Sequence, residues 1–315
     1  MKIIVTGGCG YKGHILVPKL LSNGHFVKVI DTCWFGNYLK EHKNLIVLKK
    51  DVRNLKLEDV SGYDIIIHLS SIANDPCGDL NPKLTWEVSA LATQQLADYA
   101  YRAKIKQFIY ASSGSVYGVK EEKRVTEELS LNPLTEYNKT KMVSERVLLS
   151  YSSNYKVQII RPATVCGFSP RMRLDVSVNL LTAAALFKGK IKVFGGSQIR
   201  PNIHIEDITD VYLHFLENSN LEGIYNAGFE NISILDIAKL VSKKTGVDID
   251  IENNFNDPRS YRLDSEKLLN TGFKPKFKVE NAIDEITEKI NTKELSNDDI
   301  HHNLKWMEKN NLSKN

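Results

Sequence analysis

The chain has 315 residues, with 42 lysines and arginines against 38 aspartates and glutamates, and 42% of its residues are hydrophobic. This length exceeds a typical domain of roughly 100–200 residues, so we expect one large α/β unit or two fused lobes. A net charge of +4 spread along the chain is too small to indicate a nucleic acid or a membrane as partner. The composition excludes collagen-like, disordered and disulfide-rich proteins.

The sequence predicts a protein of the cytoplasm. No apolar stretch approaches the roughly 18–20 residues that a membrane span needs. Residues 1–5 have the pattern of a strand and lack the charged head and apolar run of a signal peptide. The four cysteines form no CxxC pair, which indicates free thiols in a reducing compartment; they are Cys9, Cys33, Cys77 and Cys166.

Short apolar runs alternate with helix-length segments through the first half of the chain. We expect strands over residues 2–6, 26–31, 45–51, 64–69, 107–112 and 157–161, and helices over residues 14–23, 83–103 and 135–150. Most of the apolar runs are continuous, as in parallel strands that are buried on both faces. The alternation predicts an α/β fold with a Rossmann-type doubly wound parallel sheet.

The alternation of strands and helices becomes less regular near Cys166, where the loops lengthen and the strands shorten. We expect strands over residues 191–194 and 249–251, and helices over residues 176–187, 208–217, 233–244 and 279–290. This pattern predicts a smaller C-terminal α/β substrate lobe, from which residues 225–227 return to the main sheet. The expected division is therefore a dinucleotide-binding domain over residues 1–165, a mainly substrate-binding lobe over 166–300, and a loosely held tail over 301–315.

A glycine-rich segment joins the first expected strand to the first helix. It reads Thr6-Gly7-Gly8-Cys9-Gly10-Tyr11-Lys12-Gly13. Gly7 can make the tight turn, Gly10 lets the backbone approach a pyrophosphate, and Gly13 lets helix and strand pack closely. The helix N-terminus then offers free N–H groups and a positive dipole end to the phosphates. The segment therefore predicts a dinucleotide site.

Asp31 ends the second strand, where a carboxylate accepts hydrogen bonds from ribose hydroxyls and repels a 2′-phosphate. Thr32 follows, with no arginine to hold that phosphate, so NAD is favoured over NADP, although Lys12 argues the other way. Asp51 closes the third strand, where it can bond the adenine amino group. The alternative for Asp31 is a solvated carboxylate at a strand end, and the alternative for Asp51 is a residue of a surface turn. The expected cofactor contacts are Gly7, Gly10, Tyr11, Gly13, Asp31, Asp51, Val52, Leu69, Tyr137 and Lys141.

A candidate hydride-transfer site lies further along the chain. Tyr137 and Lys141 are four residues apart and share one face of a helix. A tyrosine with its ordinary pKa near 10 is a poor base at neutral pH, but a nearby ammonium and an oxidised nicotinamide favour the phenolate. Ser113 follows the fifth strand, whose end opens toward the ligand crevice in this topology. Its hydroxyl can orient a substrate hydroxyl.

Taken in order, these motifs resemble the extended short-chain dehydrogenase/reductase family, and within it the nucleotide-sugar epimerase/dehydratase branch. They are the glycine loop, Ser112-Ser113-Gly114-Ser115-Val116-Tyr117-Gly118, the YxxxK pair, Arg161-Pro162, and Arg200 with Ile203-His204-Ile205-Glu206-Asp207. The resemblance covers roughly residues 1–290. It implies an NAD-binding Rossmann domain, a C-terminal nucleotide-sugar lobe, a catalytic triad of Ser113, Tyr137 and Lys141, and a homodimer built on a four-helix bundle.

The sequence departs from its relatives at positions that bear on the reaction. The 4,6-dehydratases of the family carry an Asp-Glu pair after the catalytic Ser or Thr, whereas this chain has Gly114 and Ser115. Neither side chain is an acid or base at neutral pH, so dehydration is not expected. Ser89, Thr164 and Cys166 stand where epimerases often have Asn, Asn and Tyr, which weakens any transfer of substrate identity. Residues 169–175 resemble a subset of bacterial surface-polysaccharide enzymes.

A nucleoside diphosphate sugar requires cationic contacts from the substrate lobe. Arg200 and Arg259 fall where the family places phosphate- or ribose-binding residues, and Asn179 matches an asparagine near the pyrophosphate. Arginine suits this role because its planar fork binds phosphate oxygens bidentately, whereas the alternative for each is a salt bridge. His68 and His204 lack the carboxylate or cysteine neighbours of a metal site, so no metal is expected.

The resulting interpretation is an NAD-dependent nucleotide-sugar epimerase, acting at C4 through a transient 4-keto intermediate in surface-polysaccharide sugar synthesis. An NAD-dependent nucleotide-sugar C4 dehydrogenase or 4-ketoreductase would use the same three residues and release its changed cofactor. A non-catalytic dinucleotide sensor on the same fold would not need Ser113, Tyr137 and Lys141. The expected partners are a nucleoside diphosphate sugar and a second copy of the chain, without nucleic acid or membrane.

Overall fold

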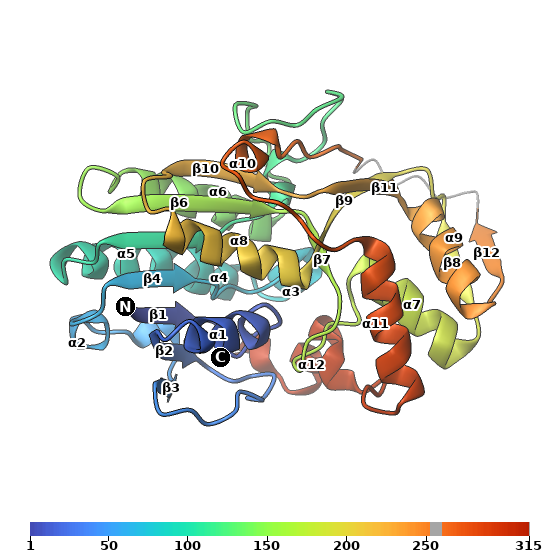
Figure 1. The fold of residues 1–315 in the computed structure, drawn as a ribbon, viewed down its shortest axis with the longest axis horizontal. Coiled ribbons are helices and arrows are strands. Elements are labelled where there is room, and N and C mark those ends of the chain that lie inside the picture. Colours follow the sequence, from blue (N-terminus) through green and yellow to red (C-terminus); the bar gives the residue numbers. More distant parts are fainter. Residues whose placement is uncertain (253–259, 315) are drawn as a thin grey trace.

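A seven-stranded parallel sheet forms the centre of the computed structural model, which describes residues 1–252 and 260–314 (Figure 1). The strand order is β10-β6-β5-β4-β1-β2-β3, which confirms the doubly wound parallel sheet. Residues 225–227 return to it as expected, since Tyr225 pairs with Ile160. The strands are β1 Lys2–Thr6, β2 Phe26–Asp31, β3 Leu45–Lys49, β4 Ile65–His68, β5 Gln107–Ala111, β6 Lys156–Pro162 and β10 Gly223–Ala227.

Helices cover both faces of this sheet because its strands are apolar on both sides. In β1, Ile3 and Val5 join one core cluster, whereas Ile4 joins the other. The first cluster includes side chains of α1 (Gly13–Ser22) and α8 (Ile205–Glu217), which lie in front of the sheet in Figure 1. The second includes side chains of α5 (Ala92–Arg102) and α6 (Glu136–Leu149). This is the two-sided burial that the continuous apolar runs predict.

The helix expected over residues 83–103 is interrupted. It consists of α4 (Pro82–Trp86), the π-helical segment η2 (Glu87–Leu91) and α5. The Ser89 carbonyl in η2 accepts hydrogen bonds from the hydroxyls of Thr93 (2.7 Å) and Ser144 (2.8 Å). The wider turn therefore directs a backbone carbonyl toward α6, and such π segments are frequent near functional sites.

The smaller lobe has its own apolar core. Helices α7 (Ser177–Lys188), α9 (Ile234–Thr245) and α11 (Val279–Asn291) pack around the parallel pair β8 (Ile191–Phe194) and β12 (Ile249–Glu252). A three-stranded sheet connects this lobe to the main body in the order β11 (Glu230–Ser233), β9 (Ile199–His204) and β7 (Thr164–Cys166). The remaining elements are η1 Val52–Asn54, α2 Leu57–Val60, α3 Asp75–Leu80, η3 Gly114–Tyr117, α10 Glu266–Leu269, η4 Asp299–His301, α12 Asn303–Lys309 and η5 Leu312–Lys314.

The expectation of a loosely held tail is wrong for residues 301–314. Helix α12 packs against the first domain, with Met307 buried in the core cluster of α5 and α6. The indole N–H of Trp306 donates to the carbonyl of Trp34 at 2.7 Å, and the amide of Asn81 donates to the carbonyl of Ser313 at 2.7 Å. Among the apolar side chains of this otherwise polar segment, Met307 and Leu312 pack against the same core cluster, and together with the Trp306 hydrogen bond they anchor the segment.

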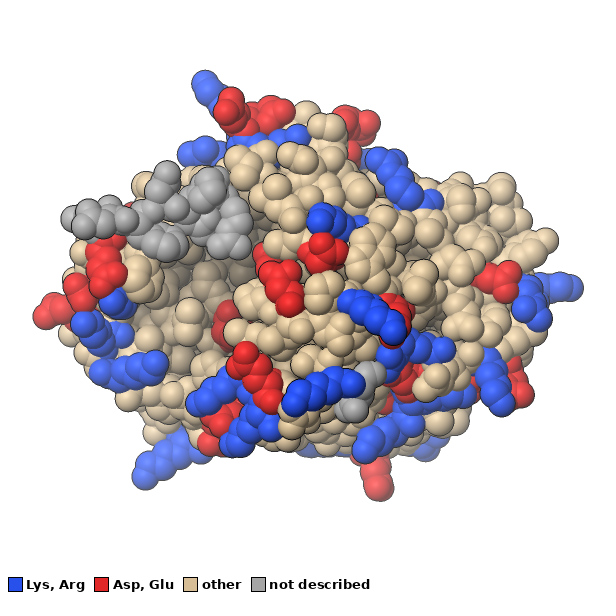
Figure 2. Space-filling view, turned by 180° about the vertical axis from the view of Figure 1, so that it is seen from behind, with Lys and Arg blue, Asp and Glu red and all other residues tan. Residues whose placement is uncertain are grey.

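The surface carries charges of both signs. On the face shown in Figure 2, lysines and arginines lie among aspartates and glutamates. All four cysteines are free. Within residues 1–252 and 260–314, no helix is both long and apolar enough to cross a membrane.

Candidate active site

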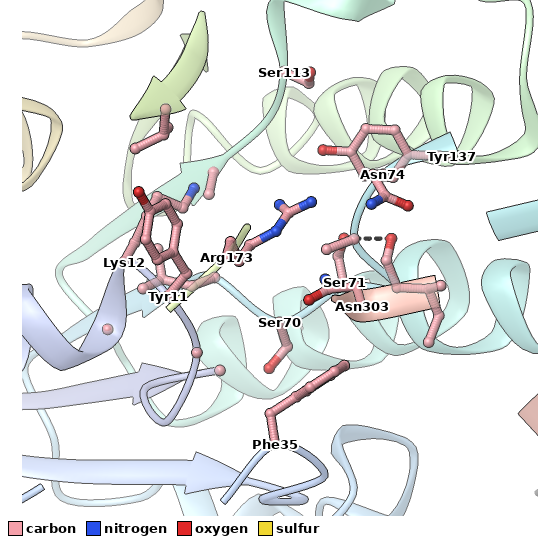
Figure 3. A pocket seen from close by; sticks show the side chains of 18 of the residues that line it. Tyr11, Lys12, Phe35, Ser70, Ser71, Asn74, Ser113, Tyr137, Arg173 and Asn303 are labelled. Atoms are coloured by element: carbon pink, nitrogen blue, oxygen red, sulfur yellow. Dashed lines mark hydrogen bonds between the residues drawn. The ribbon is translucent and has the colours of Figure 1, made fainter. Parts of the chain in front are cut away.

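A cavity of about 370 Å³ opens at the carboxyl ends of β1, β2, β4 and β5. Ligands of doubly wound proteins bind in this crevice, where the strand order reverses. Figure 3 shows Ser113 and Tyr137 at one end of the cavity and Phe35 at the other. The predicted residues that line it are Gly7, Gly10, Tyr11, Gly13, Asp31, Asp51, Val52, Leu69, Ser113, Tyr137 and Lys141.

The glycine loop has the shape that a dinucleotide needs. Gly7 has a φ of +72°, and a Cβ there would lie 2.7 Å from the backbone nitrogen of Ser70. A Cβ on Gly13 would lie 2.2 Å from the carbonyl oxygen of Gly8, so only glycine allows α1 to begin this close to the loop. Residues 10–13, which lead into the N-terminus of α1, line the cavity, so the positive end of the helix dipole lies where a pyrophosphate would bind.

Asp31 stands at the end of β2 on the cavity wall. Its carboxylate accepts backbone N–H groups from Cys9 (3.0 Å) and Cys33 (2.7 Å). Burial raises the pKa of Asp31, and these hydrogen bonds oppose that rise. Each carboxylate oxygen still has a lone pair for a ribose hydroxyl, so the residues fit NAD. Asp51 also lines the cavity, and it forms an ion pair with Arg53 at 2.8 Å.

Ser113, Tyr137 and Lys141 meet in the same cavity, as the motif spacing predicts. Thr135 caps α6 by accepting the N–H of Asn138 (3.3 Å), so the helix begins directly before Tyr137. The Lys141 ammonium lies 5.8 Å from the centroid of the Tyr137 ring and donates to the Ala111 carbonyl at 2.7 Å. The helix thus places the phenol and the ammonium on one face beside the end of β5.

Burial controls the acidity of these groups. It raises the pKa of Tyr137 to about 12, and a hydrogen bond with Ser113 opposes the rise. Burial also lowers the pKa of Lys141 well below its usual range, and the Lys12 cation lowers it further. Lys12, whose ammonium lies 3.4 Å from the Tyr212 hydroxyl, has its pKa lowered by burial to about 8. Anionic phosphates at the glycine loop would favour the charged forms of both lysines.

A hydrogen-bond chain that the motif did not reveal holds Ser113. The Ser113 hydroxyl lies 2.7 Å from the Ser115 hydroxyl, which in turn donates to the side-chain oxygen of Asn138. Ser115 thus occupies the position of a dehydratase glutamate but links β5 to α6.

Other polar residues near the site hold the scaffold together. Arg161 forms a buried bidentate ion pair with Glu145, in which its Nε and one terminal nitrogen donate to the two carboxylate oxygens (2.9 and 2.6 Å). Its other terminal nitrogen donates to the Tyr117 hydroxyl (2.7 Å). His68 is fully buried between the hydroxyls of Thr6 and Thr93. Among residues 1–252 and 260–314, no three His, Cys, Asp or Glu side chains gather closely enough to hold a metal ion.

Of the predicted substrate-lobe residues that the structure describes, Asn179 and Arg200 do not line this cavity. Asn179 is fully buried; its amide donates to the Tyr11 hydroxyl (3.0 Å) and the Arg173 carbonyl (2.8 Å), so it braces the wall from behind. Arg200 lies on β9 and affects the cavity through Tyr261, whose pKa its charge lowers against the larger effect of burial. Arg259 lies outside the described residues.

Other cavity residues are either weaker candidates from the sequence, as Arg171 and Arg173 are, or are not expected from it at all. Arg173 lines the wall beside Arg171 and forms an ion pair with Asp175 at 2.9 Å. Both arginines belong to the stretch 169–175, whose unusual charge pattern was the available signal. Asn303 and Met307 reach the cavity from α12, for which a polar tail gave no signal.

Comparisons with known proteins agree with this geometry. The sequence model of the NAD dependent epimerase/dehydratase family matches residues 3–228. The chain is 31% identical to an uncharacterized UDP-glucose epimerase, YtcB, of Bacillus subtilis over 78% of this chain and 83% of that protein. It is 27% identical to a UDP-glucose 4-epimerase of Lactobacillus helveticus over 88% of this chain and 92% of the relative.

A solved structure extends the likeness to three dimensions. The UDP-glucuronic acid 4-epimerase of Bacillus cereus in complex with NAD has a TM-score of 0.80 and 26% identity, covering 93% of this chain and 97% of that one. The family match spans more than half of the chain, and the glycine loop, the Asp31 carboxylate and the Ser-Tyr-Lys set meet in one cavity. The chain therefore belongs to the NAD-dependent epimerase/dehydratase family.

Proposed function

We propose that this protein is an NAD-dependent nucleotide-sugar epimerase that inverts C4 through a transient 4-keto sugar, in the synthesis of surface-polysaccharide sugars. One observation carries the proposal: Ser113, Tyr137 and Lys141 line the same cavity as the glycine loop and Asp31. A sugar carbon held beside the catalytic residues is thus held beside the dinucleotide. The names of the relatives from L. helveticus and B. cereus support C4 as the site and UDP as the nucleotide.

The side chains divide the proton chemistry among them. NAD, when bound, supplies a hydride acceptor and later the hydride donor. Tyr137 takes the proton of the C4 hydroxyl as the ketone forms and returns it as the alcohol is restored. Lys141 stabilises the phenolate by its positive charge, and Ser113 fixes the sugar oxygen. Inversion requires the keto sugar to present its other face, while the nucleotide anchors the intermediate.

We further propose that the substrate diphosphate is held by arginines of the smaller lobe, with Arg200 and Arg259 as the family-matched pair, while Asn179 supports Tyr11 on the cavity wall. Arg173 is an additional candidate because it lines the cavity. The division into a cofactor domain over residues 1–165 and a substrate lobe over 166–300 belongs to the same proposal.

We also propose a homodimer that forms through α5 and α6. Leu91 and Tyr101, near these helices, are 60% and 52% exposed.

The test is to incubate the purified protein with UDP-, GDP-, CDP- and dTDP-sugars while following nicotinamide absorbance and product stereochemistry together. An epimerase produces the C4-inverted sugar without accumulating NADH. Stoichiometric NADH with a keto product would instead establish a dehydrogenase. Binding of NAD without turnover of any sugar would favour a dinucleotide sensor.

A further inference from the structure

Arg171 is a buried cation on the cavity wall with an unused donor. The residue is 4% exposed, and its Nε has no hydrogen-bond partner among the described residues. One terminal nitrogen donates to the Asn303 side-chain oxygen at 2.7 Å, and the other to the Met172 carbonyl at 3.3 Å. An unsatisfied N–H on a buried guanidinium is costly, so its position on a cavity wall indicates a ligand acceptor.

Helix α12 fixes this arginine in place. Asn303, the first residue of α12, accepts from Arg171 while its own N–H donates to Asp175 (3.2 Å). Just before the helix, the His301 carbonyl accepts the N–H of Leu174 at 2.8 Å. Residues 171–175 are therefore joined to the C-terminal segment by three hydrogen bonds, which involve Arg171, Leu174 and Asp175. Figure 3 shows Asn303 entering the cavity from this helix.

The neighbours of Arg171 identify which part of the cavity it serves. Its guanidinium lies 3.9 Å from the centroid of the Phe35 ring, at the opposite end of the cavity from Ser113. The Asp31 carboxylate is close enough to stabilise the Arg171 charge. Asp31 is the residue that fits the adenosine ribose, so Arg171 lies at the adenosine end and away from the hydride-transfer site.

The hydrogen bonds of Arg171 within the described residues go to neutral acceptors, so its charge has no directly bonded counterion there. Burial and the neighbouring Arg173 lower the pKa of Arg171 to about 10, although Asp175 and Asp31 act in the opposite direction. Asp175 is already committed to Arg173 and to the backbone of Asn303. A pyrophosphate oxygen would give the Arg171 Nε both an acceptor and a countercharge.

We propose that Arg171, held by Asn303, binds the ADP moiety of NAD, and that α12 thereby closes the adenosine end of the cofactor site. This inference rests on the proposed function only for the use of NAD. Trp306 bonds Trp34 and the buried Met307 lines the cavity, so these contacts hold α12 against the adenosine end. The arrangement predicts a cofactor that stays bound between turnovers, as an epimerase that regenerates its NAD requires.

The test measures ligand binding to the nucleotide-free, full-length protein by calorimetry, with NAD, ADP-ribose, nicotinamide mononucleotide and NADP as probes. Arg171→Met should weaken NAD and ADP-ribose by the same factor, roughly 10- to 100-fold, the range for losing a hydrogen bond to a charged group. Nicotinamide mononucleotide should bind unchanged. Asn303→Ala should weaken the same two ligands to a smaller extent and speed NAD release from the loaded protein. Glu308→Ala, on the exposed side of α12, is the matched control and should change neither quantity.

Three results would overturn the inference. Unchanged NAD and ADP-ribose affinity in both variants would show that the arginine is structural. Equal weakening of nicotinamide mononucleotide would indicate general distortion of the cavity, and weakening confined to NADP would assign Arg171 to a 2′-phosphate. None of these readouts depends on turnover of a sugar, so the inference and the proposed epimerase activity fail separately.

Discussion

At the scale of single residues, Tyr137 and its surroundings set the chemistry. Burial raises its pKa to about 12, so an empty cavity holds a neutral phenol at physiological pH. In the proposed reaction, the positive charge that favours the phenolate comes from Lys141 and from the oxidised cofactor. We therefore expect proton transfer to depend on occupancy of the dinucleotide site.

Tyr137→Phe should lower kcat by at least 10²- to 10⁴-fold, the usual contribution of a general acid–base group. NAD affinity should change little because the ring remains in place. The measurement is the rate of sugar inversion together with an NAD titration. Tyr151→Phe, the same chemical change just beyond the end of α6, is the control and should keep full activity. Retention of more than a tenth of the wild-type kcat in Tyr137→Phe would contradict the assigned role.

Residue-level prediction succeeded where a short motif fixes the geometry. The glycine loop, Asp31 and the YxxxK pair are local patterns. Their predicted ligand contacts all line the cavity, namely Gly7, Gly10, Tyr11, Gly13, Asp31, Tyr137 and Lys141. Asn179 was matched by position alone, and its side chain is instead committed to Tyr11 and Arg173. Arg171 and Asn303 are 132 residues apart and meet only in the folded chain, so no local pattern could pair them.

At the scale of elements, a buried ion pair joins α6, which carries the catalytic tyrosine, to β6. Glu145 and Arg161 are each about 1% to 2% exposed, and Ser112 at the end of β5 also donates to Glu145. The carboxylate therefore connects the helix with two strands. By joining these elements, the Glu145 carboxylate holds Tyr137 of α6 and Ser113 after β5 at a fixed distance from each other.

Glu145→Leu alone should lower the free energy of unfolding by about 3–5 kcal/mol because it leaves Arg161 buried without a countercharge. The double variant Glu145→Leu/Arg161→Met should lose less than the single variant, since no buried charge remains. Urea denaturation of the wild type, both single variants and the double variant gives the coupling energy. Additive losses in the double variant would show that the two side chains do not act as a pair.

His68 at the end of β4 makes the fold sensitive to acid. Burial, with a smaller effect from Lys141, lowers its pKa from 6.5 to about 3. The unfolded chain therefore binds more protons between pH 6.5 and 3, so stability falls as the pH drops through this window. The loss at pH 4.5 should reach up to about 3 kcal/mol at 1.36 kcal/mol per pKa unit. His68→Gln should flatten the fall in denaturation free energy between pH 7 and 4.5; an unchanged slope would contradict this.

Element-level prediction worked for the strands of the main sheet and for β8 and β12, but it missed the connecting sheet of β7, β9 and β11 and the irregular helix. Continuous apolar runs identify parallel strands directly, and the strand bounds agree to within about two residues. The π segment Glu87–Leu91 depends on Ser144 reaching the Ser89 carbonyl from another helix. Such a contact between distant residues leaves no periodic signal in the sequence.

At the scale of the whole molecule, the two lobes and the C-terminal helix enclose one cavity. The two lobes could be expected from the sequence because the lengths of their strands and loops differ. The sequence could not indicate that the tail returns to the first domain, since the anchoring contacts of Trp306 and Met307 depend on a surface assembled from distant segments.

The proposed homodimer is tested by the solution mass. The wild type should sediment as a dimer at micromolar concentration, and Leu91→Glu should shift it toward the monomer by placing a charge in an apolar interface. Leu180→Glu is the matched control, because it makes the same substitution at a 45% exposed leucine of α7, away from the proposed interface. This control should leave the mass unchanged. A monomeric wild type would contradict the dimer.

In the proposed reaction, a hydride leaves C4 of the sugar and returns to the same carbon on its other face. A nucleotide sugar carrying deuterium at C4, supplied in ordinary water with unlabelled free NADH, tests this directly. We expect a C4-inverted product that retains its deuterium, because the cofactor stays bound while it carries the label. Inversion with loss of the deuterium to solvent or to the free nucleotide pool would contradict it.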